Sequence, residues 1–309
     1  MKFAVETWAP EYGIAADDAQ MSDSSDDVAV DIEIALDKWS PIDPAPSGMP
    51  SAIMFVDGVR RIDARVWITD GEIVRPGVCA TVAAGSVVCT DTSATVVDAR
   101  VVRGLFTGPT DAAANIETRN GTYRYFACAG DSPEDLYLGI HNEMTKIETG
   151  LGTSPDCELV VFDGPLRGRN DPNGVGYVKT QHVQYLPEEL RPVLAGLDAG
   201  QRTPLFHLGG RGGNRYSWYL RLPIARTQPW AGIVRCEIPA SGSVGDAVER
   251  ANQVTALLPG YASEPHKDGR APQNLYPIAG LENELRRRLG DQNLMERALR
   301  LAAVQDNRA

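Results

Sequence analysis

Two short apolar runs, each ending in Asp-Gly, are the feature that most constrains the fold of this chain. AIMFVDG covers residues 52–58, and LVVFDG covers residues 159–164. Short runs rich in Val, Ile and Phe are typical of strands that are buried on both faces. Asp57 and Asp163 stand where these runs stop. Because sites in open α/β sheets form at the carboxyl ends of strands, we expect the two carboxylates to converge if the strands are neighbours.

The segments between these runs predict the order three strands, helix, strand. After AIMFVDG, hydrophobicity alternates in RRIDARVWITDG and again in EIVRPGVCATVAAGSVVCT, on either side of a hairpin turn at Asp70-Gly71. Ser132 and Pro133 predict the start of a helix that Gly150 ends. Further strands are expected near 174–186, 204–208, 217–223 and 232–238, and further helices near 244–257, 278–289 and 293–303. The pattern predicts an α/β fold, with a mixed sheet flanked by helices.

The bulk composition predicts one folded domain behind an N-terminal arm. The chain has 309 residues, of which 43% are hydrophobic and 23% charged, values that are ordinary for a globular protein. We expect an acidic and proline-rich arm over residues 1–50 and one domain over residues 51–309. No apolar run approaches the ~18–20 residues of a membrane span, and the first residues lack a signal-peptide pattern. A cytoplasmic protein without a membrane partner is therefore expected, and its five scattered cysteines favour reduced thiols.

A third carboxylate is expected from the helix that separates the two Asp-Gly runs. At about 100° per residue, the apolar positions of this helix form one stripe. The stripe consists of Leu136, Ile140, Met144 and Ile147. Glu143 is expected near its centre and Glu148 at its edge, so Glu143 is the predicted inward carboxylate. An inward glutamate satisfied by an arginine or a backbone amide remains the alternative.

A set of two aspartates and one glutamate predicts a metal centre. Carboxylates that lie close together repel one another unless a positive charge lies between them, and oxygen ligands suit a hard divalent cation. Two such ions, Mg²⁺ or Mn²⁺, orient and activate a water and stabilise a leaving oxygen. Hydrolysis of a phosphodiester is the reaction that fits this chemistry. A single Asp-Gly is weak support, because the pair is also a common hairpin turn.

Several motifs in one order resemble the NurA nucleases, the partners of the hexameric HerA ATPase in DNA end processing. They are FVDGVRR, LVVFDGPL, VGYVKTQ, RYSWYLRL and NLYPIAGLENEL, and they extend from residue 52 to about residue 290. The resemblance implies an RNase H-like core, a toroidal homodimer, and dependence on Mn²⁺ or Mg²⁺. It also implies 5'-3' exonuclease and single-strand endonuclease activity on DNA, with a HerA-like hexameric translocase as partner.

Carried over position by position, the resemblance assigns roles to single residues. Asp57 matches the first metal ligand, Asp163 the ligand before Gly-Pro-Leu, and Glu143 the helical glutamate. Lys179 matches the lysine of the Gly-x-x-Lys strand, expected to touch phosphate or the reacting centre; a surface lysine is the alternative. Tyr219 and Arg221 share one face of a strand and resemble positions near the family's active site.

The C-terminal motif departs from the family pattern. Many members place a histidine or an acid shortly after Tyr-Pro, whereas this chain reads YPIAGLENEL without a histidine. Ile278, Leu281, Leu285 and Leu289 form the predicted apolar stripe of this helix. Glu282 lies beside the stripe and Glu284 faces away from it, so Glu282 is the predicted additional metal ligand.

The distribution of charge indicates that DNA could bind only at a locally basic surface. The net charge of −11 opposes binding to a polyanion, although much of the acid lies near the N-terminus. A local basic channel would use the arginines beside the strands, and the residues expected to contact DNA are Arg60, Arg167, Arg169, Tyr219 and Arg221. The alternative is that these arginines form an ordinary solvated surface.

Two other functions compete with the nuclease. A haloacid-dehalogenase-like phosphatase is suggested by VFDGPL, but Val161 stands where that family has an acid two residues from the aspartate. A catalytically silent DNA-binding or assembly subunit of an ATPase complex would keep the fold without the reaction. Sequence leaves open the polarity and strand preference of cleavage, its dependence on the ATPase, and a repair or anti-phage role.

Overall fold

The computed structural model describes residues 22–23, 27–152, 157–166, 168–180, 183–210, 213–224 and 230–306. They form two compact units, drawn from Met1–Phe55, Val88–Ala94 and Ser154–Ala279 for the first and from Val56–Val87, Thr95–Thr153 and Gly280–Ala309 for the second. Strand β3 (Ile53–Asp70) and helix α4 (Tyr276–Arg288) each continue from the first unit into the second.

The first unit is a sheet covered by helices on both faces. Its strands are β2 (Asp27–Ala29), β8 (Leu159–Asp163), β9 (Gly174–Val178), β11 (Phe206–Gly209), β12 (Arg215–Arg221) and β13 (Ile233–Pro239). A short parallel pair joins β1 (Ser22–Asp23) to β10 (Val183–Gln184). The remaining elements are η3 (Leu36–Lys38), η4 (Glu188–Leu190), α2 (Arg191–Gly196), α3 (Val244–Leu257) and η5 (Leu258–Tyr261).

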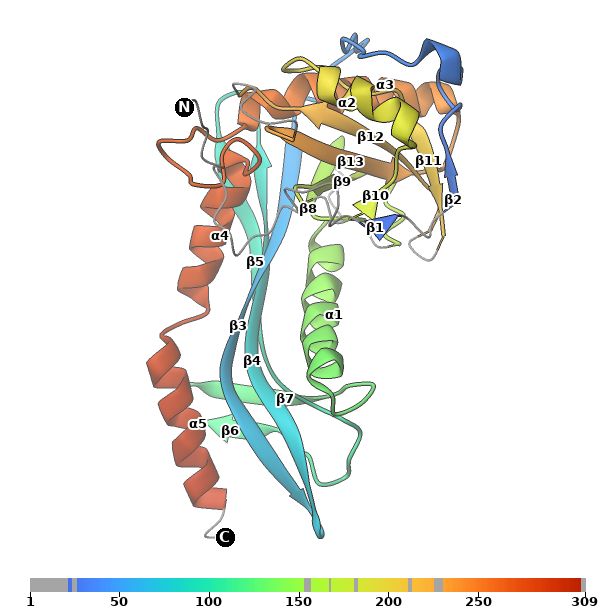
Figure 1. Cartoon of the computed structure of the whole chain (residues 1–309). Helices are drawn as coiled ribbons and strands as arrows, with labels where there is room; N and C mark the ends of the chain where they lie inside the picture. The colour runs from blue at the N-terminus through green and yellow to red at the C-terminus, as the bar shows by residue number, and fades with distance from the viewer. Residues whose placement is uncertain are drawn as a thin grey trace, which may run out of the picture. The chain divides into compact units, whose positions relative to one another are not determined.

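Residue alternation along β12 explains why both faces are covered. Tyr219 packs in a core cluster with Leu194 of α2 and Phe206 of β11. The neighbouring Trp218 points to the opposite face, where its indole Nε1 donates to Thr255 Oγ1 of α3 at 3.1 Å. Figure 1 shows α2 and α3 alongside this group of strands. The strands are therefore buried on both sides, as the apolar runs predict.

The second unit is built on two long strands. After β3, a turn at Gly71, whose φ is +62°, leads into β4 (Ile73–Cys89), and β5 (Ala94–Thr107) follows. The unit is completed by β6 (Ile116–Thr118), β7 (Gly121–Ala127), α1 (Pro133–Leu151) and α5 (Gln292–Asp306). In Figure 1, α1 lies on one side of β3 and β4, and α5 lies on the other.

The strand order confirms the predicted mixed sheet. In the described residues, the hydrogen-bonded order is β2-β11-β12-β13-β9-β8-β3-β4-β5-β7-β6. β8 and β9 are parallel, whereas β9 and β13 are antiparallel. The RNase H-like core that was expected consists of β3, β4 and β5 in sequence, followed by α1 and then by β8, which pairs with β3. Helices on both faces of the sheet complete the α/β class.

Two details of the predicted elements change. The expected first two strands are one continuous strand, β3, so Asp57-Gly58 lies within a strand and only Gly71 marks a hairpin turn. The described part of the expected arm also packs into the first unit, because β2 pairs with β11 and the buried Trp39 joins the core cluster of α2. A single domain over residues 51–309 stays a prediction.

The five cysteines are buried and unpaired, in line with the expected reduced thiols. No helix in the described ranges combines the length and apolar character that crossing a bilayer requires.

A buried ion pair fixes residues 30–42 to the first unit, and its loss is expected to destabilise the fold. Both Nη atoms of Arg202, which is 1% exposed, donate to the Glu33 carboxylate at 2.7–2.8 Å. We predict that Glu33→Ala lowers the free energy of unfolding by about 3–5 kcal/mol, because a buried guanidinium loses its counter-charge. Urea unfolding measures the change. Asp98→Ala, which breaks an exposed pair with Arg100, is the control, expected to cost less than about 1 kcal/mol; equal losses would contradict the prediction.

Candidate metal centre

Asp57 is held within β3 as a buried carboxylate. It is 6% exposed, and its Oδ1 accepts a hydrogen bond from the Gly58 amide at 2.7 Å. Phe55 before it is fully buried, and its ring packs edge-on against Tyr261 at 5.1 Å between centroids. A carboxylate at this depth is costly unless it is paired, hydrogen-bonded or bound to a cation.

Asp163 ends β8, where the backbone changes direction. Gly164 has a φ of +109°, a conformation that favours glycine, and its amide donates to Tyr177 O of the parallel strand β9 at 2.8 Å. The Asp163 side chain keeps 17% of its surface exposed. The carboxylate therefore stands at the carboxyl end of a buried strand, as the sequence predicts.

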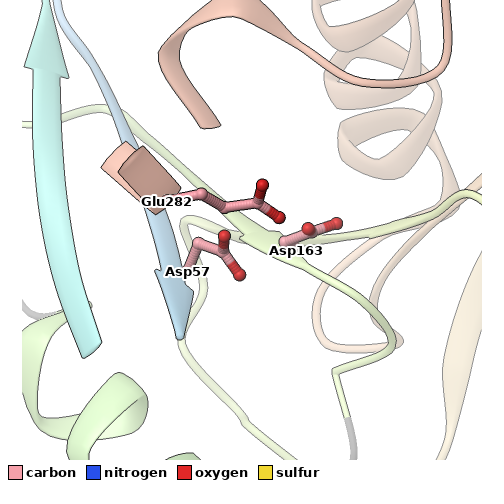
Figure 2. Close-up of side chains that lie close together, drawn as sticks. All are labelled: Asp57, Asp163 and Glu282. Carbon is pink, nitrogen blue, oxygen red and sulfur yellow. The ribbon is translucent and has the colours of Figure 1, made fainter. Parts of the chain in front are cut away.

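Glu282 joins the two aspartates. The apolar stripe of α4 is buried as predicted, and Glu282 beside it is half-buried. One carboxylate oxygen from each of Asp57, Asp163 and Glu282 lies within 4.8 Å of the others, and Figure 2 shows the three side chains next to one another. Glu284, the competing glutamate, instead pairs with Arg287 and Arg288. Three of the predicted metal ligands thus form one cluster.

The donor chemistry of this cluster fits a hard divalent cation. It consists of carboxylate oxygens only, from two strands and one helix. Such donors suit Mg²⁺ and Mn²⁺, whereas thiolates and imidazoles favour softer metals. Three carboxylates at this spacing repel one another in the absence of positive charge, so a bound cation would stabilise the arrangement.

Lys179 supplies one positive charge to the cluster. It follows β9 directly, and its Nζ donates to Asp163 Oδ2 at 2.6 Å and to Asn274 Oδ1 at 3.0 Å. The side chain of Lys179 is 10% exposed. The lysine is therefore largely buried and bonded to one carboxylate of the cluster.

A polar chain behind Lys179 was not predicted from the sequence. Asn274 is fully buried, and its Nδ2 donates to Asp268 Oδ2 at 2.6 Å. Burial alone raises the pKa of Asp268, but hydrogen bonds from Asn274 and the Arg270 amide, together with the Arg270 charge, hold this pKa below its ordinary value. Asn274 thus links an ionised carboxylate to the Lys179 ammonium. It lies in the NLYP motif, but its residue type carries no signal of this role.

Glu237 holds the backbone that follows Asp163. Its Oε1 accepts from the Leu166 amide at 2.6 Å, and its Oε2 accepts from Arg235 at 2.5 Å and from Arg215 at 3.1 Å. Burial raises the pKa of Glu237, but the charge of Arg235, the Leu166 amide and Arg215 outweigh this and lower it overall. A buried charged network therefore sets the path of the chain beyond β8.

Glu143 does not lie in the described carboxylate cluster, contrary to expectation. Its side chain is 16% exposed and pairs with Lys146 at 3.2 Å. It lines a pocket of about 410 Å³ with Phe106 and Phe126 of neighbouring strands. The apolar stripe of α1 continues to Leu151. At about 100° per residue, Glu143 lies roughly 60° from the centre of this stripe, on the side of β5 and β7.

Glu148 is the glutamate of α1 that faces β3. It is 8% exposed, and a Cβ placed on Gly58 would lie 2.5 Å from its Oε1 and 2.8 Å from Met144 Cγ. Gly58 therefore permits a close approach of α1 to β3, next to Asp57. The sequence places Glu148 at the edge of the stripe. Angular spacing alone does not tell which flank of a helix faces β3.

The residues expected to contact DNA differ in their exposure. Arg60 is exposed, and its Nη1 lies 3.2 Å from His141 Nδ1. Arg169 is 8% exposed, with its guanidinium 4.7 Å from the centroid of the Phe162 ring. Tyr219 and Arg221 share a strand face as predicted, but each is only 1% exposed. Their burial differs from the surface position that a DNA contact requires. Arg167 lies outside the described residues.

The Glu237 network predicts a pH dependence of stability. A lowered pKa in the folded state stabilises the fold above the unfolded-state pKa, and this contribution is lost as pH falls through the folded-state value. We expect Glu237→Gln to be less stable than wild type at pH 7 and to lose less stability between pH 5 and 3. Urea unfolding across this range measures both. Parallel stability curves for the two proteins would rule out this linkage.

Comparisons with known proteins give structural likeness only. No family model matches the chain, and no curated protein matches its sequence. Among solved structures, the NurA nuclease from Sulfolobus solfataricus aligns with a TM-score of 0.48 and 11% identity, over 80% of this chain and 81% of that one. Endonuclease V from Bacillus subtilis gives 0.33 and 14%, over 79% and 84%. The catalytic domain of human endonuclease V gives 0.31 and 17%, over 79% and 85%. The chain is thus similar in structure to these nucleases.

Proposed function

We propose that this chain is a divalent-metal-dependent nuclease that hydrolyses phosphodiester bonds in DNA. The observation that carries the proposal is the cluster of Asp57, Asp163 and Glu282, with an oxygen of each within 4.8 Å of the others. All three positions were selected from the sequence for this chemistry. The motif resemblance to NurA nucleases supports DNA as the substrate.

Within this proposal, each residue of the cluster has a stated task. Asp57, Asp163 and Glu282 would hold one or two Mn²⁺ or Mg²⁺ ions through their carboxylate oxygens. When bound, such ions supply the Lewis acidity that activates a water and stabilises the leaving oxygen of a phosphodiester. Lys179 keeps Asp163 in place through a 2.6 Å hydrogen bond. An ammonium has three donors. Asp163 and Asn274 take two of them, and we assign the third to a phosphate oxygen.

The finer features of the proposed function rest on the motif resemblance. They are 5'-3' exonuclease and single-strand endonuclease activity, a homodimer, a HerA-like hexameric ATPase as partner, and a role in DNA end processing in the cytoplasm. Among the predicted DNA contacts, Arg60 has the exposed position that binding to a phosphate requires. With a net charge of −11, binding by the isolated chain is expected to be weak and to fall steeply with salt.

The test is cleavage of labelled single-stranded and duplex DNA in Mn²⁺, Mg²⁺ or EDTA. We predict cleavage only with metal, and losses on the order of 100-fold or more for Asp57→Asn, Asp163→Asn and Glu282→Gln, because each removes a charged ligand. Glu284→Gln is the matched control on the same helix, since Glu284 pairs with Arg287 and Arg288. A wild type that is inert even with its ATPase would instead support the silent DNA-binding subunit.

The two glutamates of α1 give a separate prediction. Glu148 lies against Gly58, beside Asp57, whereas Glu143 pairs with Lys146. We therefore assign to Glu148 the helical carboxylate role that the motif resemblance gave to Glu143. Glu148→Gln is expected to reduce cleavage on the order of tenfold or more, because the carboxylate packed against Gly58, the residue after Asp57, is lost, and Glu143→Gln to leave it nearly unchanged. Rates measured at saturating Mn²⁺ decide between them, and the reverse ranking would restore Glu143 to the site.

A further inference from the structure

A buried carboxylate on β3 organises three strands of the second unit. The side chain of Asp63 is fully buried. Its Oδ2 accepts from Thr81 Oγ1 of β4 at 2.5 Å and from Tyr123 OH of β7 at 2.9 Å. Its Oδ1 accepts from Arg61 Nε at 2.8 Å. Asp63 thus bonds to β4 and β7 from its place on β3, and Arg61 neutralises its charge.

Arg61 connects Asp63 to the C-terminal end of helix α4. Its Nη1 donates to Gly290 O at 2.6 Å and its Nη2 to Leu289 O at 3.3 Å. The last carbonyls of a helix have no partner within the helix, and their partial negative charge favours a cation. One planar guanidinium therefore bonds to the sheet on one edge and to the end of α4 on the other.

Gly85 of β4 also allows helix α4 to pack closely against the sheet. A Cβ placed on Gly85 of β4 would lie 3.0 Å from Leu281 Cδ1 and 3.1 Å from Leu285 Cδ2. Leu281, Leu285 and Leu289 are nearly fully buried. This apolar contact fixes the face that α4 presents, but sliding along the helix axis is opposed mainly by directional bonds such as those of Arg61.

The metal ligand Glu282 lies on the same helix. It is next to Leu281 and seven residues before Leu289, about 10 Å along the axis. Asp57 lies on the same strand as Arg61 and Asp63. A shift of α4 along β3 would therefore move the Glu282 carboxylate relative to that of Asp57. Catalytic constellations tolerate errors of only about 0.5 Å.

We propose that Arg61, held by Asp63, is a positioning residue that fixes α4 along the sheet and so places Glu282 at the metal centre. The inference rests on the proposed metal-dependent function. It assigns Arg61 an internal role instead of the DNA contact that its place in a basic motif suggests. Its side chain is 18% exposed, and its nitrogens bond to Asp63, Leu289 and Gly290.

The test is Mn²⁺ binding, measured by the loss of the free-ion electron paramagnetic resonance signal in the absence of DNA. Arg61→Ala is expected to raise the dissociation constant for Mn²⁺ on the order of tenfold, as for other groups that orient a ligand. Arg65→Ala is the matched control, because Arg65 is an exposed arginine on the same face of β3. It should leave Mn²⁺ binding unchanged.

A double-mutant cycle separates positioning from general destabilisation. If Arg61 acts through Glu282, Arg61→Ala has little further effect on Mn²⁺ binding in a Glu282→Gln background, whereas independent effects add. Urea unfolding in EDTA reports the loss of stability separately. Should Arg61→Ala fail to fold, Asp63→Asn is the second variant. Its single amide oxygen can still accept from Thr81 and Tyr123, while its NH₂ group cannot accept from Arg61, so Mn²⁺ binding is expected to weaken in the same direction.

The outcomes distinguish this inference from the function on which it rests. Unchanged Mn²⁺ binding in a folded Arg61→Ala protein, or additive effects in the cycle, would overturn the positioning role alone. Unchanged Mn²⁺ binding in Glu282→Gln would overturn the metal centre itself. A loss of DNA affinity with normal Mn²⁺ binding in Arg61→Ala would instead assign Arg61 to the nucleic-acid surface.

Discussion

The repulsion among three closely spaced carboxylates is the constraint on which the rest of the site depends. Asp57, Asp163 and Glu282 have oxygens within 4.8 Å of one another. In a site of reduced dielectric, this arrangement persists only if the backbone elements that carry the carboxylates are held firmly and positive charge lies nearby. The three carboxylates stand on regular elements, the strands β3 and β8 and the helix α4. Lys179 meets the second condition through its bond to Asp163, and a bound cation would add to it.

Buried pairs of a carboxylate and an arginine support the elements that carry the cluster. A buried carboxylate is neutralised by a cation and uses its remaining oxygen positions to bind backbone or neighbouring strands. Glu237 does so with Arg235 and Arg215 beyond β8, and Asp63 does so with Arg61 at the end of α4. Breaking such a pair leaves a buried charge and is costly, so these networks specify one geometry. In the proposed metal centre, the placement of the ligands would therefore depend on residues that do not themselves bind the ion.

Sequence reasoning found the residues whose position follows from local pattern. Asp57 and Asp163 were predicted from apolar runs that stop, and Glu282 from its place beside an apolar helical stripe; each prediction uses only neighbouring residues. Glu143 was expected near the centre of the α1 stripe, but at about 100° per residue it lies roughly 60° from that centre. Angular spacing alone also does not tell which flank of the helix faces β3. The close approach of Glu148 to Gly58 depends on the packing of α1 against the sheet. Such packing is a tertiary property.

The supporting network was beyond the reach of sequence for the same reason. Asn274 lies 95 residues from Lys179 in the chain, and Arg61 lies 229 residues from Gly290. Neither pair has a spacing or composition that marks it. Tyr219 and Arg221 were placed on the correct strand face but judged accessible, because alternation predicts a face and not what covers it. Here α2 and its core cluster cover that face.

A crystal structure of the protein soaked in Mn²⁺, with an anomalous difference map, tests directly whether the three carboxylates bind a metal ion. We expect an anomalous peak bonded to oxygens of Asp57, Asp163 and Glu282 at about 2.1 Å, close to the distances of about 2.0–2.1 Å that Mg²⁺ keeps to its oxygen ligands. A map at saturating Mn²⁺ with no peak at these three carboxylates, or with ions bound only elsewhere, would contradict this expectation.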